Sequence, residues 1–368
     1  MGALITLMYS PWLKAPPKPD SALAVHTLGK GLKPRSRKIA VAIIGLDEKV
    51  AKKTRQHLYA TSWAFGKLSV RDLGDVRKGT SDFLIPLLRE LHSAEITPIL
   101  LGGKDQELFT AQYLAFSELN RQVSLVQIDR TIDLHPEGPQ GAALDKAVHR
   151  KGRKKQFHLS HLGAQQHLTN PAIYDLFDAR GFEAVRLGQA QADISGLEPQ
   201  IRDGDLLGLN IGAINHNEAP ARKGYHPSGF SLQEATQLAY YAGNSDKLSS
   251  FGIYGFSPND QQEEPNELTA AAYAQLIWYF LHGYSRRVGD FPAGTKGLLE
   301  YIVDIRGFEQ LTFWKSRRSN RWWIEVPDGK YKGEERHRLV PCSYQDYLTA
   351  SAEQNLPDRL LRAFRRYA

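Results

Sequence analysis

Strand-length hydrophobic runs alternate with helical patterns through most of this 368-residue chain. The first run, IAVAIIGL at 39–46, is nearly continuous and rich in Ile and Val, which is typical of strands buried on both faces of a parallel sheet. Similar runs lie at 97–101, 122–129, 155–163, 182–188, 205–213 and 247–256, with helical patterns at 47–59, 82–96, 106–119, 171–180, 231–242 and 269–282. The alternation predicts a three-layer α/β fold, a doubly wound and mostly parallel sheet with helices on both faces.

The pattern changes after residue 283, where Arg, Trp and Tyr become denser. We predict one strand there, a basic turn at 316–320, a second strand, and a helix that starts near Pro357. We therefore divide the chain into an N-terminal arm (1–38), an α/β domain (39–285) and a C-terminal extension (286–368) that packs on the main domain.

Composition excludes several classes of protein. The single cysteine, Cys342, rules out an internal disulfide framework and a Cys-rich zinc module, and we interpret it as a packed thiol. It fits a reducing compartment, so we expect a cytoplasmic protein. No stretch approaches the roughly 18 apolar residues of a membrane span.

The net charge of +7 is partly clustered before two predicted strands, where solvated loops are a simpler explanation than nucleic-acid binding.

The common nucleotide and hydrolase motifs are missing from the sequence. No G-x-G-x-x-G follows the first predicted strand, and no phosphate-binding P-loop, G-x-S-x-G or H-E-x-x-H motif occurs. In doubly wound sheets the functional residues lie at the carboxyl ends of the strands. We therefore look for chemistry in the loops after residues 101, 128, 162, 211 and 254.

Five motifs at those strand ends resemble the ureohydrolase family, which includes arginase, agmatinase and formimidoylglutamase. They are DLGDV at 72–76, LGG at 101–103, DRTID at 129–133, GLNIGAINHNEAP at 208–220 and SP at 257–258, in the family's order. The resemblance covers about residues 40–285, and the C-terminal extension is similar to that of divergent formimidoylglutamase-like proteins. It implies the arginase fold, and in active members a pair of Mn²⁺ ions that hydrolyses guanidino or formimino groups.

The resemblance also places six metal-ligand positions and one substrate-binding position in this chain. They are Asp105, Asp129, Thr131, Asp133, Asn210 and Gly212, with Gly255 at the substrate position. The family has four carboxylates and two histidines as ligands, whereas this chain keeps at most three carboxylates. Two Mn²⁺ ions need several carboxylate or imidazole ligands to activate a water molecule. We therefore expect a degenerate site with no metal and no other cofactor.

Alternatives remain for the side chains that survive. Asp129 and Asp133 could accept backbone hydrogen bonds at the strand end, bind one cation with Asp105, or pair with Lys104. His216, in the loop that follows Asn210, is the best candidate for a replacement ligand, although a lone loop histidine is usually a surface residue. These residues would allow an active hydrolase with a rebuilt or mononuclear Mn²⁺ site.

A basic-aromatic cluster in the extension is a candidate partner surface. It consists of Trp314, Arg317, Arg318, Arg321, Trp322 and Trp323. Trp and Arg are enriched in protein-binding hot spots, and the same residues could bind nucleic acid, or the tryptophans could simply pack on the sheet. We expect a non-catalytic ureohydrolase-fold protein that binds an unidentified protein partner; nucleic acid is disfavoured, and the oligomeric state is open.

Overall fold

A computed structural model describes residues 11–32, 38–103, 107–142, 144–148, 156–305, 310–327, 334–353 and 355–367. Nine strands form the main sheet in the order β1-β3-β2-β4-β9-β8-β5-β6-β7. They are β1 (Leu13–Lys14), β2 (Val41–Gly45), β3 (Val70–Val76), β4 (Thr97–Leu101), β5 (Gln122–Ile128), β6 (Gln156–Ala164), β7 (Glu183–Arg186), β8 (Leu206–Asn210) and β9 (Ser250–Tyr254). Within this main sheet, as far as its strands are described, only the pairing of β1 with β3 is antiparallel. The predicted fold class is confirmed.

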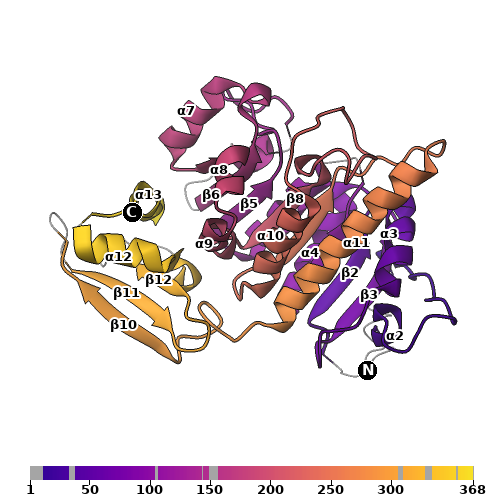
Figure 1. The fold of residues 1–368 in the computed structure, drawn as a ribbon, viewed down its shortest axis with the longest axis horizontal. Helices are drawn as coiled ribbons and strands as arrows, with labels where there is room; N and C mark the ends of the chain where they lie inside the picture. Colours follow the sequence, from indigo (N-terminus) through magenta and orange to yellow (C-terminus); the bar gives the residue numbers. More distant parts are fainter. Residues whose placement is uncertain are drawn as a thin grey trace.

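Helices cover both faces of this sheet (Figure 1). The longer ones are α3 (Glu48–Ala60), α4 (Ser81–Ser93), α5 (Glu107–Leu119), α7 (Pro171–Arg180), α10 (Leu232–Asn244) and α11 (Glu263–Ser285). Shorter helices are α2 (Leu28–Gly31), α6 (Asp145–Val148), α8 (Leu187–Ala192) and α9 (Glu198–Arg202). Helices α3, α10 and α11 contribute to one hydrophobic core, and α4, α5 and α7 to the other.

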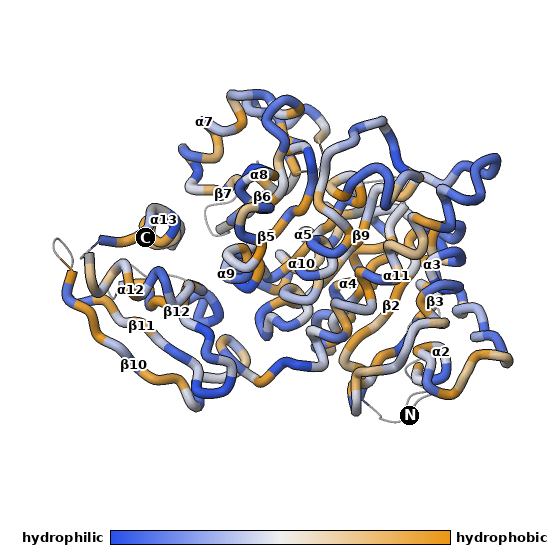
Figure 2. The backbone as a smooth tube through the Cα atoms, in the orientation of Figure 1, coloured by the Kyte–Doolittle hydropathy of each residue, from blue (hydrophilic) through white to orange (hydrophobic). Residues whose placement is uncertain are grey.

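Strand β2 shows why a continuous hydrophobic run forms a central strand. Val41 and Ile43 belong to the core under α3 and α11, whereas Ala42 and Ile44 belong to the core under α4. Successive side chains alternate between the faces, so both faces must be apolar where helices cover both. Figure 2 shows hydrophobic residues along the central strands β2, β5 and β9. In the part of the chain that the structure describes, no helix has the length and apolar character to cross a bilayer.

The C-terminal extension contains a second, antiparallel sheet. Its order is β10 (Leu298–Val303), β11 (Leu311–Ser316), β12 (Trp322–Glu325) and β13 (Leu339–Cys342), followed by α12 (Tyr344–Glu353) and α13 (Asp358–Tyr367). The sequence predicted β11, β12 and α13, but not β10, β13 or α12. This sheet has its own core with α12 and α13, which includes the buried Cys342.

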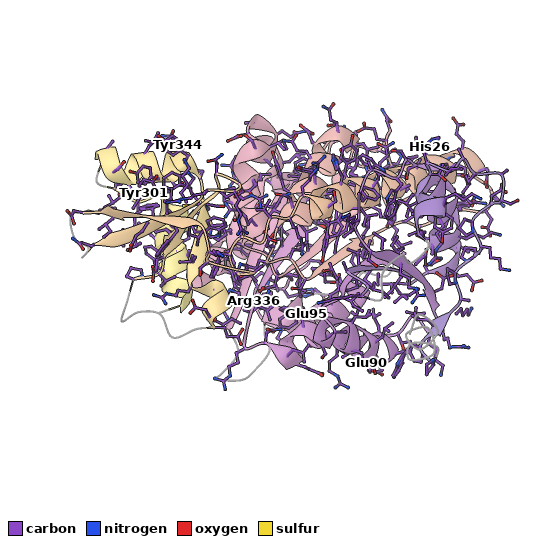
Figure 3. All side chains as sticks on the ribbon, turned by 90° about the horizontal axis from the view of Figure 1, so that it is seen from below. His26, Glu90, Glu95, Tyr301, Arg336 and Tyr344 are labelled. Carbon is purple, nitrogen blue, oxygen red and sulfur yellow. The ribbon has the colours of Figure 1, made fainter. Side chains whose placement is uncertain are left out.

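Polar contacts join the extension to the main domain. Asp205, fully buried before β8, lies 2.7 Å from Arg336 Nη2 and 3.3 Å from His337 Nε2. Arg202 of α9 donates to the carbonyl oxygens of Trp322 and Cys342 at 3.2 Å each. Figure 3 shows Arg336 near Glu95 on the lower side, with Tyr301 and Tyr344 at the far end of the extension.

Candidate functional site

The predicted positions after β5 and β8 meet at the carboxyl edge of the main sheet. Strand β8 lies between β5 and β9, so the loops that follow these strands are neighbours. Asp129, Thr131, Asp133 and Asn210 line one small cavity, together with Tyr254. Its volume is about 10 Å³, close to the lower limit for one water molecule. The cavity is too small for two metal ions and a substrate.

The two glycine positions lie directly beside Asn210. A Cβ atom on Gly255 would lie 2.3 Å from Asn210 Oδ1, and φ at Gly255 is +92°, which disfavours any other residue. A Cβ atom on Gly212 would lie 2.9 Å from Asn210 Oδ1 and 2.9 Å from Arg130 Nη1. Neighbouring side chains therefore occupy the space that a ligand carboxylate at 212 would need.

Asp129 is held by hydrogen bonds from the protein. It is 3% exposed, and Oδ1 accepts from the backbone N–H of Arg130 at 2.7 Å. Burial raises the pKa of this carboxyl to about 7, against the opposing effects of backbone hydrogen bonds, the charge of Arg130 and a hydrogen bond from the Asn210 side chain. Asn210 Oδ1 accepts from Gly212 N at 2.8 Å. Both side chains thus organise the loop backbone, which is one of the roles the sequence allowed for Asp129.

Two arginines lie beside Gly212. Arg222, 9% exposed, donates through Nη1 to the carbonyl oxygens of Ile211, Gly212 and Ile214. Arg130 Nη1 lies 3.5 Å from the same Gly212 oxygen, and Nη2 donates to Lys223 O at 3.1 Å. Two guanidinium cations therefore adjoin Gly212, one of the predicted ligand positions.

His216 lies near these arginines. Partial burial and the charges of Arg222 and Arg130 lower the pKa of its imidazole. Its Nδ1 is buried with no hydrogen-bond partner, and its ring centroid lies 5.8 Å from that of Tyr225. Neighbouring cations disfavour a further cation, so this location is unsuited to a replacement metal ligand.

The described residues do not fit a binuclear manganese centre. Among them, no group of three or more His, Cys, Asp or Glu side chains is placed to hold a metal ion. Asp105 and Lys104 lie outside the described residues. The carboxylates that remain at the predicted positions are Asp129 and Asp133, and the charge of Arg130 acts on Asp129. The chain's described residues therefore provide no basis for a metal-dependent step.

The sequence analysis overlooked the residues that give this site its charge. Arg130 stands within the DRTID motif, where the related motif D-A-H-x-D has alanine, and Arg222 and His226 follow Pro220 in the same loop. Arg222 Nη2 donates to His226 O at 2.8 Å. The sequence did contain a signal for this charge. Arg130 follows the predicted ligand position Asp129 and places a cation where the related motif has a small neutral residue.

The structure corrects the predicted partner surface in the extension. Trp323 is 1% exposed and Trp322 is 5% exposed. Arg202 of the main domain lies 4.5 Å from the centroid of the Trp323 ring, and Arg321 Nε lies 3.1 Å from Glu198 Oε1. These side chains are buried because β12 is a central strand whose two faces are both covered. Within the predicted cluster only Arg317 and Arg318 are exposed, while Trp314 is half-buried.

A larger cavity lies at the opposite edge of the sheet, between the main domain and the extension. Its volume is about 540 Å³, within the range of small-molecule sites. Arg336 Nε and His92 Nε2 are buried there without hydrogen-bond partners. Charged groups of both signs line it, namely Glu95, Asp246, Lys247, Arg287 and Arg336. This mixture does not indicate one class of ligand.

Comparison with known proteins shows similarity in structure but not in sequence. Neither a family model nor a curated protein matches the sequence. The formiminoglutamase of Trypanosoma cruzi with Mn²⁺ is similar with a TM-score of 0.61 and 15% identity, over 71% of this chain and 99% of that one.

Two bacterial proteins are similar to the same degree. The formimidoylglutamase of Bacillus subtilis has a TM-score of 0.60 and 15% identity, over 77% of this chain and 99% of that one. The proclavaminate amidino hydrolase of Streptomyces clavuligerus has a TM-score of 0.56 and 17% identity, over 70% and 95%. This chain is therefore structurally similar to the arginase-superfamily ureohydrolases and has their α/β fold, with an additional small antiparallel sheet.

Proposed function

We propose that this protein is a non-catalytic, formimidoylglutamase-like member of the ureohydrolases that has lost the binuclear metal site. The observation that carries the proposal is the position of Arg130, whose Nη1 lies 2.9 Å from where a Cβ atom on Gly212 would be. A guanidinium group there repels divalent cations. It also fills space that the carboxylate of an active enzyme would need.

Metal analysis tests this proposal directly. The full chain is purified with and without Mn²⁺ in every buffer and analysed by mass spectrometry for bound manganese, beside the formiminoglutamase of Trypanosoma cruzi, whose structure contains Mn²⁺, as a positive control. We expect less than about 0.1 Mn²⁺ per chain, and no release of urea or formamide from arginine, agmatine or formiminoglutamate. Two tightly bound ions per chain, or manganese-dependent turnover, would refute the proposal.

The alternative of an active hydrolase with a rebuilt site has less support. It needs His216 to join Asp105, Asp129 and Asp133, and His216 lies near arginines. It predicts one bound Mn²⁺ and a turnover that Asp129→Ala abolishes, so the same metal and activity measurements separate it from the leading proposal.

We propose further that the protein acts by binding a protein partner through the extension. The formiminoglutamase and formimidoylglutamase structures compared above leave more than a fifth of this chain uncovered, and the extension exposes Ile302 and Tyr344 by 58% and 55%. Affinity capture should compare the native chain with Ile302→Asp, with Tyr279→Asp on α11 as the exposed control. A partner retained by the control and lost from Ile302→Asp supports the proposal, and one retained by both refutes it.

A further inference from the structure

The two arginines at the former metal site share one acceptor. Arg222 Nη1 lies 2.9 Å and Arg130 Nη1 lies 3.5 Å from the carbonyl oxygen of Gly212. Two like charges are thus held side by side at the end of β8. Such an arrangement costs free energy unless a negative charge compensates it.

Protein carboxylates compensate this charge poorly. Neither guanidinium forms an ion pair within the described part of the chain, where their bonds run to backbone carbonyl oxygens. Asp129 acts on Arg222 through its charge, without an ion pair between the two side chains. Buried arginines are usually paired.

Histidines extend the cluster toward the surface. The point where a Cβ atom on Gly224 would lie is 3.3 Å from His226 Nε2 and 3.5 Å from Arg130 Nη2, so the imidazole and the guanidinium flank the same space. Partial burial, followed by the charges of Arg130 and Arg222, lowers the pKa of both His216 and His226. We name Arg130, His216, Arg222 and His226 the arginine–histidine cluster.

Two polar atoms of this cluster lack partners. Arg222 Nε and His216 Nδ1 are buried and make no hydrogen bond. An unsatisfied buried donor typically costs about 1–3 kcal/mol, and more where it is charged. A guanidinium group presents its N–H groups in a planar fork that matches two oxygens of a carboxylate or phosphate. One oxyanion could supply both the missing acceptor and the missing charge.

We propose that the arginine–histidine cluster binds a small molecule through a carboxylate or phosphate group. This inference rests on the proposed function, because the anion takes the place of the lost cations. The anion bridges Arg130 and Arg222 at the carboxyl ends of β5 and β8. Exposed Lys223 and Tyr225 form the outer rim of the cluster.

Calorimetric titration of the full chain at constant ionic strength tests the proposal. Inorganic phosphate and glutarate are the two probes, with chloride as the reference anion. We expect saturable binding of at least one probe, and a loss of at least about tenfold in affinity for Arg130→Gln, since the variant loses a charge-assisted hydrogen bond to the anion. Whichever probe binds more tightly identifies the chemical group of the ligand.

Two further variants distinguish binding at the arginine–histidine cluster from a general effect of charge. Arg317→Gln removes an equally charged but exposed arginine of the extension and should leave the affinity unchanged. Arg222→Lys, which keeps the charge but loses the planar fork, should also weaken binding, and circular dichroism verifies that each variant is folded. Absence of saturable binding, or equal affinity in Arg130→Gln, overturns this inference alone, because the manganese analysis separately decides the proposed function.

Discussion

Arg130 and Arg222 both donate hydrogen bonds to the carbonyl oxygen of Gly212, although the two arginines lie in loops that follow different strands. Arg130 follows β5, whereas Arg222 lies 12 positions after the end of β8, at Asn210. The two guanidinium groups therefore connect the loops through backbone carbonyl oxygens.

Gly212→Asp should supply an internal counter-charge to these arginines. A Cβ atom at 212 would lie 2.9 Å from Arg130 Nη1, so Arg130 must move aside to make room for the new carboxylate, and the two side chains can then pair. We expect phosphate or glutarate affinity to fall by at least about tenfold, since the variant carboxylate occupies the donors. Titration calorimetry measures this fall.

Gly212→Ala is the matched control because it adds the Cβ atom without the charge. It should keep most of the affinity of the native chain. If the two variants weaken binding equally, the loss is steric and the electrostatic explanation is wrong.

The sequence predicted the central strands of the main sheet better than its outer strands and the C-terminal extension. The run at 39–46 is apolar at every position that faces a covering helix, so its pattern identified β2. Strand β3 has the sequence VRDLGDV, and it was not predicted because its charged residues are not typical of a buried strand. Asp72 and Asp75 are tolerated there because Arg55 of α3 pairs with both, at 2.8 and 2.6 Å. Such a tertiary pairing cannot be seen in a local pattern.

The candidate site was predictable in position but not in charge. The motif order located Asp129 and Asn210, which do line one cavity. The role of Arg222 depends on the path of the loop after β8, which brings it back onto the carbonyls of 211–214. In the extension, Trp322 and Trp323 seemed available because the sequence did not indicate that β13 pairs with β12 and buries them.

Trp323→Ala should destabilise the protein strongly. The ring is 1% exposed and packs against Arg202 of the main domain, so its removal leaves a cavity at the junction. We expect a loss of about 3–5 kcal/mol in the free energy of unfolding, as for other large-to-small core changes. Urea denaturation measures it.

Tyr344→Ala serves as the comparison for that variant. Tyr344 is 55% exposed, and its replacement should cost far less. A Trp323→Ala chain as stable as the Tyr344→Ala chain would show that the ring is not part of the core.

Asp205→Asn should weaken the attachment of the extension. Its carboxylate faces Arg336, His337 and Lys247, whose charges hold the pKa of Asp205 well below its usual range despite complete burial. Removing one partner of a buried charge network costs about 3–5 kcal/mol, because the remaining cations stay buried.

The pH dependence of this effect follows from the lowered pKa. Asp205 contributes stability above its unfolded-state pKa near 3.8 and loses it only as the pH falls further. Chemical denaturation at pH 7 should therefore show the full loss for Asp205→Asn. Asp260→Asn, in an exposed pair with Lys49, should leave the stability nearly unchanged, because solvent screens exposed ion pairs. Equal effects of the two variants would contradict the assignment.

His161 should make the protein sensitive to mild acid. It is fully buried on β6, its Nε2 lies 3.0 Å from the carbonyl oxygen of Thr131, and burial lowers its pKa to about 4. The unfolded chain takes up a proton near pH 6.5, whereas the folded chain resists it until about pH 4. Stability should therefore fall as the pH drops from 6.5 to 4, by about 3 kcal/mol for this group.

The slope of stability against pH is the quantity to measure. His161→Gln can still donate to Thr131 O but cannot take up a proton, so its urea-unfolding free energy should fall less steeply between pH 6.5 and 4 than that of the native chain. If His161→Gln is less stable than the native chain by the same amount at every pH, the test still holds. Only a difference between the two slopes shows that His161 takes up a proton on unfolding. His26→Gln, at an exposed position far from the extension in Figure 3, should keep the native slope. If His161→Gln also keeps it, another group takes up the proton, and burial of His161 is not the cause of the acid sensitivity.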